Sequence, residues 1–416
     1  MEAKKKRVAI VGAGPSGLVT CKHLLARGFH PVVFDAGAAV GGVWTRTLAS
    51  TRLQTPAAPY RFSDFPWSED VDAASFPRHD QVAAYLAAYA RRFGVMERVR
   101  LGCTVVGATE REVATWERWS GNGEAFGDGT GEWHLTVRHD DSNGEPPSTQ
   151  LLSRFQKQGI HSPRLARLMC SILLQRWLLT KLTETYLKAH VPMQKHGMVP
   201  DHSFARSSLG WRIGILPEGF YDKVDQGIIE LRKCSSFSFC TDGLVLDQEG
   251  DVVGADVVVL ATGFDTDAPL RRLFTSSPSW FRDIVVDAAS PDVLPLYRQC
   301  VHPRIPQLAV VGHAESEASI YPYEMMAKWV AHLLDGAVRL PGSVAGMERD
   351  VAEWTRWRAW ARRSGGGFFF KPCIHAVTIW YHDQLCRDMG HRARWKKGLL
   401  AEWLQPYGPA DYADIQ

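Results

Sequence analysis

The residues with the clearest chemical meaning form a glycine-rich turn near the start of the chain. A short apolar run, Val8 to Val11, leads directly into Gly12-Ala13-Gly14-Pro15-Ser16-Gly17, and residues 18–27 have helical character. Strand, G-x-G-x-x-G and helix in this order are typical of a dinucleotide-binding unit. The glycines permit a tight turn, a close approach of a pyrophosphate and close packing of helix on strand, and the helix N-terminus favours phosphate. The turn therefore predicts a nucleotide site.

An acidic residue follows at the distance that this kind of site requires. A second predicted strand, Pro31 to Phe34, ends at Asp35. A carboxylate in this position accepts hydrogen bonds from ribose hydroxyls and repels a 2′-phosphate. The site therefore favours an ADP-containing cofactor such as FAD or NAD over NADP.

A second glycine pair, Gly41-Gly42-Val43-Trp44, comes soon after the acid. From the residues alone it is a loop with a buried tryptophan, but G-G-x-W after an acid-terminated strand resembles the flavoprotein monooxygenases. Two further blocks, Thr51-Arg52-Leu53-Gln54-Thr55-Pro56 and Tyr60 to Trp67, resemble the segment that follows it in plant flavin-containing monooxygenases. Residues 379–385 and 401–412 resemble the same plant branch.

Two later apolar runs predict buried strands. Ala255 to Leu260 is a continuous, β-branched run that ends in Ala261-Thr262-Gly263-Phe264, and it is typical of a buried parallel strand. It resembles the A-T-G-[FY] element that returns the chain to the FAD domain in this family. Another predicted buried strand, Leu308 to Val311, runs into Gly312 and a helix over 324–334, an element that lies near the flavin ring in relatives.

The remaining predicted elements are ordinary. Residues 80–93 form a packing helix, with apolar positions Val82, Tyr85, Leu86 and Tyr89. Residues 98–106 and 132–137 alternate like strands, and residues 165–182 form an amphipathic helix.

The resemblance implies an α/β protein with an FAD/NAD(P)-binding, three-layer Rossmann-like fold built from discontinuous segments. It implies FAD and NADPH as cofactors, O₂ as co-substrate, and a small molecule with a soft sulfur or nitrogen nucleophile as substrate. No side chain is assigned as a catalytic acid or base. The expected cofactor contacts are Gly12, Ala13, Gly14, Pro15, Ser16, Gly17, Asp35, Gly41, Gly42, Val43, Trp44, Gln54, Thr55, Thr262 and Gly263.

The NADPH fingerprint of this family, a second G-x-G-x-x-[GSA], is missing from the sequence. Gly121-Asn122-Gly123 and Gly127-Asp128-Gly129 lack a preceding apolar strand and a following helix, so they are surface turns. Around residues 150–158, sequence that resembles the FAD domain passes directly into sequence that resembles the region after the fingerprint. We therefore expect an internal deletion there, with a truncated NADPH-binding domain. The alternative function is a non-catalytic or NADPH-incompetent FAD-binding variant.

The expected organisation has four segments. An N-terminal FAD-binding segment covers 1–150, a helical remnant of the NADPH and substrate region covers 151–245, a C-terminal FAD-binding segment covers 246–340, and a helical tail covers 341–416. Because the deletion removes a strand, we also expect an unpaired sheet edge and marginal stability, unless residues 151–155 replace that strand.

Composition excludes several other classes. The net charge is only +3 over 416 residues, so nucleic acid is a poor partner. Eight cysteines without C-x-x-C or zinc spacing indicate reduced thiols, and the fifteen histidines show no metal-binding spacing, so no metal is expected. No apolar signal core precedes the first strand, and the most apolar window is interrupted by charges. We expect a cytoplasmic protein without a transmembrane anchor.

Overall fold

The structure is a computed structural model of the 416-residue chain. It describes residues 7–110, 133–139, 169–204, 216–217, 219–247, 250–260, 272–274, 294–314, 316, 318, 320–365, 374, 377–392, 396 and 407–415.

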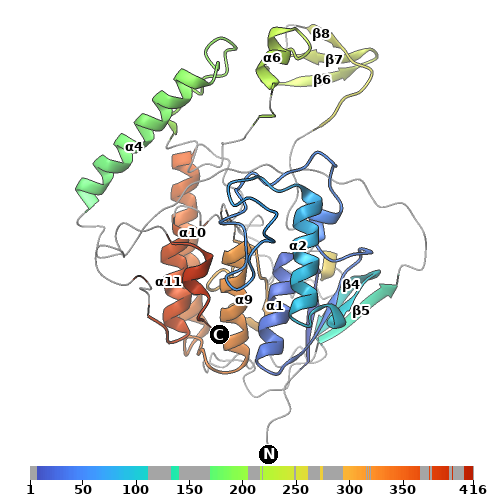
Figure 1. The fold of residues 1–416 in the computed structure, drawn as a ribbon, viewed down its shortest axis with the longest axis vertical. Helices are drawn as coiled ribbons and strands as arrows, with labels where there is room; N and C mark the ends of the chain where they lie inside the picture. Colours follow the sequence, from blue (N-terminus) through green and yellow to red (C-terminus); the bar gives the residue numbers. More distant parts are fainter. Residues whose placement is uncertain are drawn as a thin grey trace, which may run out of the picture.

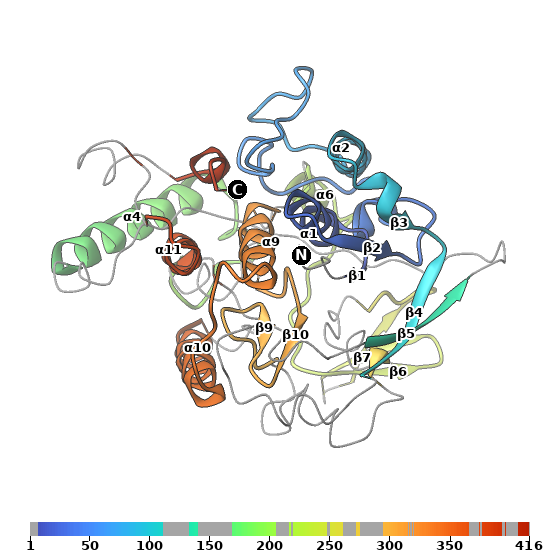
Figure 2. The same cartoon turned by 90° about the horizontal axis from the view of Figure 1, so that it is seen from below.

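The N-terminal part is built around a parallel sheet with strand order β1-β2-β3 (Figure 1; strands labelled in Figure 2). Strand β1 (Arg7–Val11) pairs in parallel with β2 (His30–Phe34), and β2 pairs in parallel with β3 (Val99–Arg100). Helix α1 (Pro15–Ala26) makes the crossover between β1 and β2. The βαβ unit predicted from the sequence is confirmed.

Helix α2 (His79–Arg92) and a long antiparallel hairpin complete this part. The predicted apolar positions of α2, Val82, Tyr85, Leu86 and Tyr89, are all buried. The predicted strand over 98–106 is divided, because β3 ends at Arg100 and β4 (Cys103–Glu110) pairs instead with β5 (Trp133–His139). Short 3₁₀ helices lie at Gly42–Thr45 (η1) and Met96–Arg98 (η2).

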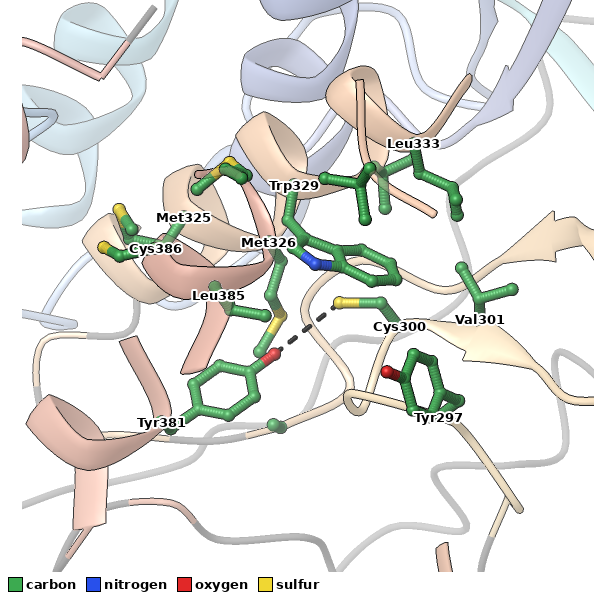
Figure 3. Packing of buried hydrophobic residues seen from close by; sticks show 14 of the residues in the cluster. Tyr297, Cys300, Val301, Met325, Met326, Trp329, Leu333, Tyr381, Leu385 and Cys386 are labelled. Atoms are coloured by element: carbon green, nitrogen blue, oxygen red, sulfur yellow. Dashed lines mark hydrogen bonds between the residues drawn. The ribbon is translucent and has the colours of Figure 1, made fainter. Parts of the chain in front are cut away.

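The C-terminal part is helical and has its own core. Helices α9 (Ile320–Leu334), α10 (Val344–Gly365) and α11 (Thr378–Asp388) lie on one side of the hairpin of β9 (Val301–His302) and β10 (Ile305–Ala309) (Figure 2). Figure 3 shows Trp329 of α9 facing Cys300 and Tyr381. A short 3₁₀ helix, η5 (Pro409–Tyr412), closes the chain.

Arg298 joins these C-terminal elements to one another. Its Nε and Nη2 donate to both carboxylate oxygens of Asp388 on α11, at 2.8 and 3.2 Å, and its Nη1 donates to Asp350 Oδ1 on α10 at 2.6 Å. Tyr381 Oη in turn donates to the carbonyl of Arg298 at 2.7 Å. A buried cation in this position is fully paired.

The two parts form one fold from discontinuous segments, as predicted. Helix α9 packs against α1, so Ile320 and Ala327 of α9 share a hydrophobic cluster with Leu18 of α1 (Figures 1 and 2). Because α1 carries the glycine turn at its start, a segment more than 300 residues later in the chain supports the predicted nucleotide site.

A third group of elements stands apart from these helices, at the top of Figure 1. It comprises α4 (Met169–His190), α6 (Phe220–Asp225) and an antiparallel sheet of β6 (Phe237–Cys240), β7 (Gly243–Leu246) and β8 (Asp251–Gly254). The helix predicted over 165–182 is present as α4.

Two predicted strands differ in the structure. Residues 255–260 form no strand, and Val257 and Val259 are 78% and 83% exposed. An apolar run forms a buried strand only where a sheet pairs with it, and none of the described strands pairs with this one. The run predicted over 308–311 is also different, because β10 ends at Ala309 and pairs in antiparallel fashion with β9.

The open sheet edge expected from the deletion remains a prediction. Among the described strands, β1 is an edge strand of the parallel sheet, and Val11 is 52% exposed. Residues 151–155, the proposed replacement strand, lie outside the described part of the chain.

Buried charged side chains of α9 connect the N-terminal and C-terminal parts. Glu324 and Lys328 lie one turn apart on α9, each 2% exposed, with Lys328 Nζ 3.4 Å from Glu324 Oε1. Both carboxylate oxygens of Glu324 accept hydrogen bonds from Ser63, one from the backbone N–H and one from the hydroxyl. Lys328 also donates to the carbonyl of Tyr412 at 2.8 Å. His23 of α1 faces the same carboxylate at 3.7 Å.

Acid is expected to destabilise this fold through two histidines. Burial lowers the pKa of His23 to about 4, against an opposing effect of Glu324, and Lys22 and Lys328 lower it further. Burial lowers the pKa of His382, which packs against Tyr321 and Tyr412, to about 3. Both side chains are neutral when folded and bind a proton near pH 6.5 when unfolded. Their stabilising contribution is therefore complete above about pH 6.5 and is lost as the pH falls towards 4 and 3.

The expected slope is about 1.4 kcal/mol per pH unit for each histidine below about pH 6. Denaturant unfolding at a series of pH values measures it. The variant His382→Phe should show a shallower slope than the wild type, and equal slopes would contradict the assignment.

Candidate functional site

The glycine turn has the geometry that phosphate binding requires. Gly12 has φ +103°, and its N–H donates to the carbonyl of Phe34 at 2.8 Å, which ties the turn to β2. Gly14 precedes α1, and Pro15 occupies the first turn of the helix. No side chain caps this helix, so its first N–H groups are not taken by a capping side chain. Such an N-terminus favours an anion.

Gly17 is required for the packing of α1 on β1. A methyl group at this position would lie 1.9 Å from the carbonyl oxygen of Gly12 and 3.3 Å from Ile10 Cγ2. No other residue fits without moving the helix away from the turn. The structure thus supplies a steric reason for the third glycine of the fingerprint.

The second glycine pair lies directly against the turn. The N–H of Gly41 donates to the carbonyl of Ala13 at 2.9 Å. A methyl group on Gly42 would lie 3.0 Å from Gly14 Cα. The two predicted glycine elements therefore meet backbone to backbone. Beyond them, Val43 is 57% exposed, and the ring of Trp44 packs edge-on against Tyr60.

The carboxylate of Asp35 holds this arrangement from the end of β2. One oxygen accepts from the N–H of Ala13 at 2.6 Å, and the other accepts from the N–H of Gly37 at 2.6 Å. Arg46 Nη2 lies 3.0 Å from the second oxygen, and Asp35 is 7% exposed. The predicted ribose acceptor thus also shapes the glycine turn.

Replacement of Asp35 by alanine is expected to destabilise the protein by about 1–3 kcal/mol, because it leaves buried N–H groups of Ala13 and Gly37 without an acceptor. The thermal midpoint measures the effect. Asp70→Ala, which removes an exposed carboxylate, is the control and should change the midpoint little. Equal effects of the two substitutions would contradict the role of Asp35.

The other predicted contacts are distributed differently. Gln54 and Thr55 directly follow a segment, 51–53, that pairs with residues 77–79. In this pairing Leu53 N–H donates to the carbonyl of Pro77, and His79 N–H donates to the carbonyl of Thr51. Thr55 is 2% exposed. Thr262 and Gly263 lie outside the described residues.

Two residues at the site were not predicted as contacts. Gly312, with φ +91°, lies so close to the turn that a methyl group there would be 2.3 Å from Ser16 Oγ. Arg46 pairs with Asp35. The G-H-A segment that follows a strand is a sequence signal that could have indicated Gly312. No sequence pattern distinguishes Arg46 from other arginines.

The described residues contain no group of three or more His, Cys, Asp or Glu side chains placed to hold a metal ion. Within the same residues, every helix is too short or too polar to cross a membrane.

Comparisons with known proteins agree on one family. A family model described as "Flavin-binding monooxygenase-like" matches residues 5–128. The "Probable flavin-containing monooxygenase 1" of Arabidopsis thaliana is 27% identical, with 98% of this chain and 96% of the relative covered. The "Putative flavin-containing monooxygenase 2" of the same plant is also 27% identical, over 92% of this chain and 97% of the relative.

Solved structures show the same fold. S-allyl-L-cysteine S-oxygenase from Allium sativum is 20% identical with a TM-score of 0.53, covering 92% of this chain and 88% of that one. An open crystal structure of cyclohexanone monooxygenase is 14% identical with a TM-score of 0.58, covering 94% and 99%.

The alignment with the first Arabidopsis relative is longer than the chain itself. It extends over 529 positions, whereas this chain has 416 residues. At least 113 of those positions, 529 minus 416, therefore hold a residue of the relative opposite a gap in this chain.

Proposed function

We propose that this chain, which belongs to the flavin-containing monooxygenase family, binds FAD on the glycine turn between β1 and α1. The observation that carries the proposal is the close meeting of Gly12, Gly17 and the Gly41-Gly42 pair at an uncapped helix N-terminus. Gly14 and Ser16 would hold the pyrophosphate, Asp35 the ribose, and Trp44 the edge of the site. Thr262 and Gly263 remain proposed contacts.

The proposed reaction is oxygenation of a soft sulfur or nitrogen atom in a small molecule, with NADPH and O₂. When bound, FAD supplies the redox and oxygen chemistry. The chain's own residues bind the cofactor, orient it and exclude water. Support for sulfur as the reacting atom comes from the S-oxygenase among the structural relatives.

A second candidate function is an FAD-binding protein that no longer accepts NADPH. Two observations favour it. The sequence lacks the second glycine fingerprint, and the alignment with the first Arabidopsis relative contains more than one hundred positions that this chain does not fill. These unfilled positions are more than a nucleotide-binding unit needs, since a βαβ unit takes about 30 residues or more.

One experiment separates the two candidates. The purified protein is examined for the visible absorbance of bound flavin, and NADPH is then added without oxygen, followed by dithionite. Bleaching by NADPH supports the monooxygenase. Bleaching by dithionite alone supports the NADPH-incompetent variant, and a protein without flavin after reconstitution with FAD contradicts both.

A further inference from the structure

Arg358 is a buried cation for which the described structure provides no counter-ion. It lies on α10, one turn after Trp354, and is 7% exposed. Its Nε donates to the carbonyl of Trp354 at 3.4 Å, and its Nη2 donates to Thr355 Oγ1 at 3.1 Å. Its Nη1 is buried without any hydrogen-bond partner. Both existing contacts come from its own helix and neither carries a negative charge.

The surrounding sequence offers no acid that could neutralise it. Between Glu353 and Asp383 the chain contains no Asp or Glu, but it contains five lysines and arginines: Arg356, Arg358, Arg362, Arg363 and Lys371. Trp354, one turn earlier on α10, packs against two other tryptophans. The ring of Trp354 lies 5.9 Å from that of Trp357 and 5.5 Å from that of Trp380.

The contrast with Arg298 shows that this is not the usual arrangement of a buried arginine in this fold. Arg298 pairs with both Asp350 and Asp388, and these contacts outweigh the effect of burial and raise its pKa. Burial instead lowers the pKa of Arg358 to about 10. A buried cation without a partner is costly, so a structural role does not account for it.

We propose that Arg358 is the anion-binding residue of a site beside α10, and that it holds the carboxylate of a small molecule with an apolar body. The free Nη1 supplies the donor for a charge-assisted hydrogen bond, and the tryptophans provide the apolar surroundings. Because the guanidinium is almost fully covered, neighbouring side chains must move apart as the ligand enters. The binding step depends only on this geometry. That the ligand is the oxygenated substrate rests on the proposed function.

The probe is 3-(methylthio)propionate, a thioether with a carboxylate, compared with its neutral amide by calorimetry on the purified protein without NADPH. The wild type is expected to bind the carboxylate roughly tenfold or more tightly than the amide, and Arg358→Gln should abolish the difference. Arg356→Gln, an exposed neighbour on the same helix, should keep it. Equal binding of the two probes by the wild type, including no binding of either, would overturn the proposal.

A stability measurement excludes a merely structural role. Arg358→Met removes an unpaired buried charge, so its thermal midpoint should equal or exceed that of the wild type, whereas Arg298→Met should lower it strongly. A loss in Arg358→Met as large as in Arg298→Met would also overturn the proposal. Neither measurement needs turnover, so failure of the site is distinguishable from failure of the monooxygenase function.

Discussion

Replacement of Gly17 by alanine is expected to destabilise the protein by about 1–3 kcal/mol or more and to weaken FAD binding at least roughly tenfold. The added methyl group would lie 1.9 Å from the carbonyl oxygen of Gly12, a backbone atom, and 3.3 Å from Ile10 Cγ2. Helix α1 must therefore move away from β1, and its first N–H groups move with it. Thermal unfolding measures the first effect, and titration of the apoprotein with FAD measures the second.

Gly14→Ala is the matched comparison, because the two effects separate there. Gly14 has φ −78°, which alanine adopts readily, and a methyl group would lie 3.7 Å from Gly42 Cα, an ordinary contact. Its thermal midpoint without cofactor should remain close to that of the wild type. FAD affinity should nevertheless fall, since the methyl group would occupy the approach of the pyrophosphate. Unchanged FAD affinity in both variants would place the cofactor elsewhere.

The second large effect is expected from Glu324→Gln, which should destabilise the protein by about 3–5 kcal/mol. Burial by itself would raise the pKa of Glu324, but Lys328, the nearby His23 and the hydrogen bonds from Ser63 outweigh it and hold this pKa well below the usual range. The carboxylate is therefore charged when folded. Glutamine keeps the shape and an acceptor for Ser63 but leaves Lys328 without its counter-charge. Denaturant unfolding measures the loss.

Glu184→Gln on α4 is the control, because Glu184 and Lys188 have the same spacing on a helix but contact solvent. It should change stability little, since exposed ion pairs contribute little. The double variant Glu324→Gln, Lys328→Met should recover part of the loss, because it removes the unpaired cation as well. A double variant as unstable as the sum of the two single ones would show that the charges act independently.

Local sequence patterns were sufficient where neighbours in the chain are neighbours in the fold. The turn from Gly12 to Gly17, the acid at Asp35 and the apolar face of α2 follow from spacing alone, because they depend on helix and strand periodicity and on steric demands within one βαβ unit. The family resemblance extended this to the fold class and to its construction from discontinuous segments. The predicted four-segment division and the position of the deletion remain predictions.

The failures have a common cause. Residues 255–260 are apolar enough for a buried strand, but whether such a run joins a sheet depends on which strand edge reaches it, and spacing along the chain carries no information about that. For the same reason, no pattern distinguished Glu324, which meets Ser63 and His23 from distant segments, or Arg358, which meets no carboxylate among the described residues. By itself the sequence determined the nucleotide turn and the resemblance to the family. Only the tertiary structure decided which charges are buried and which of them have partners, because burial and pairing are properties of contacts between segments.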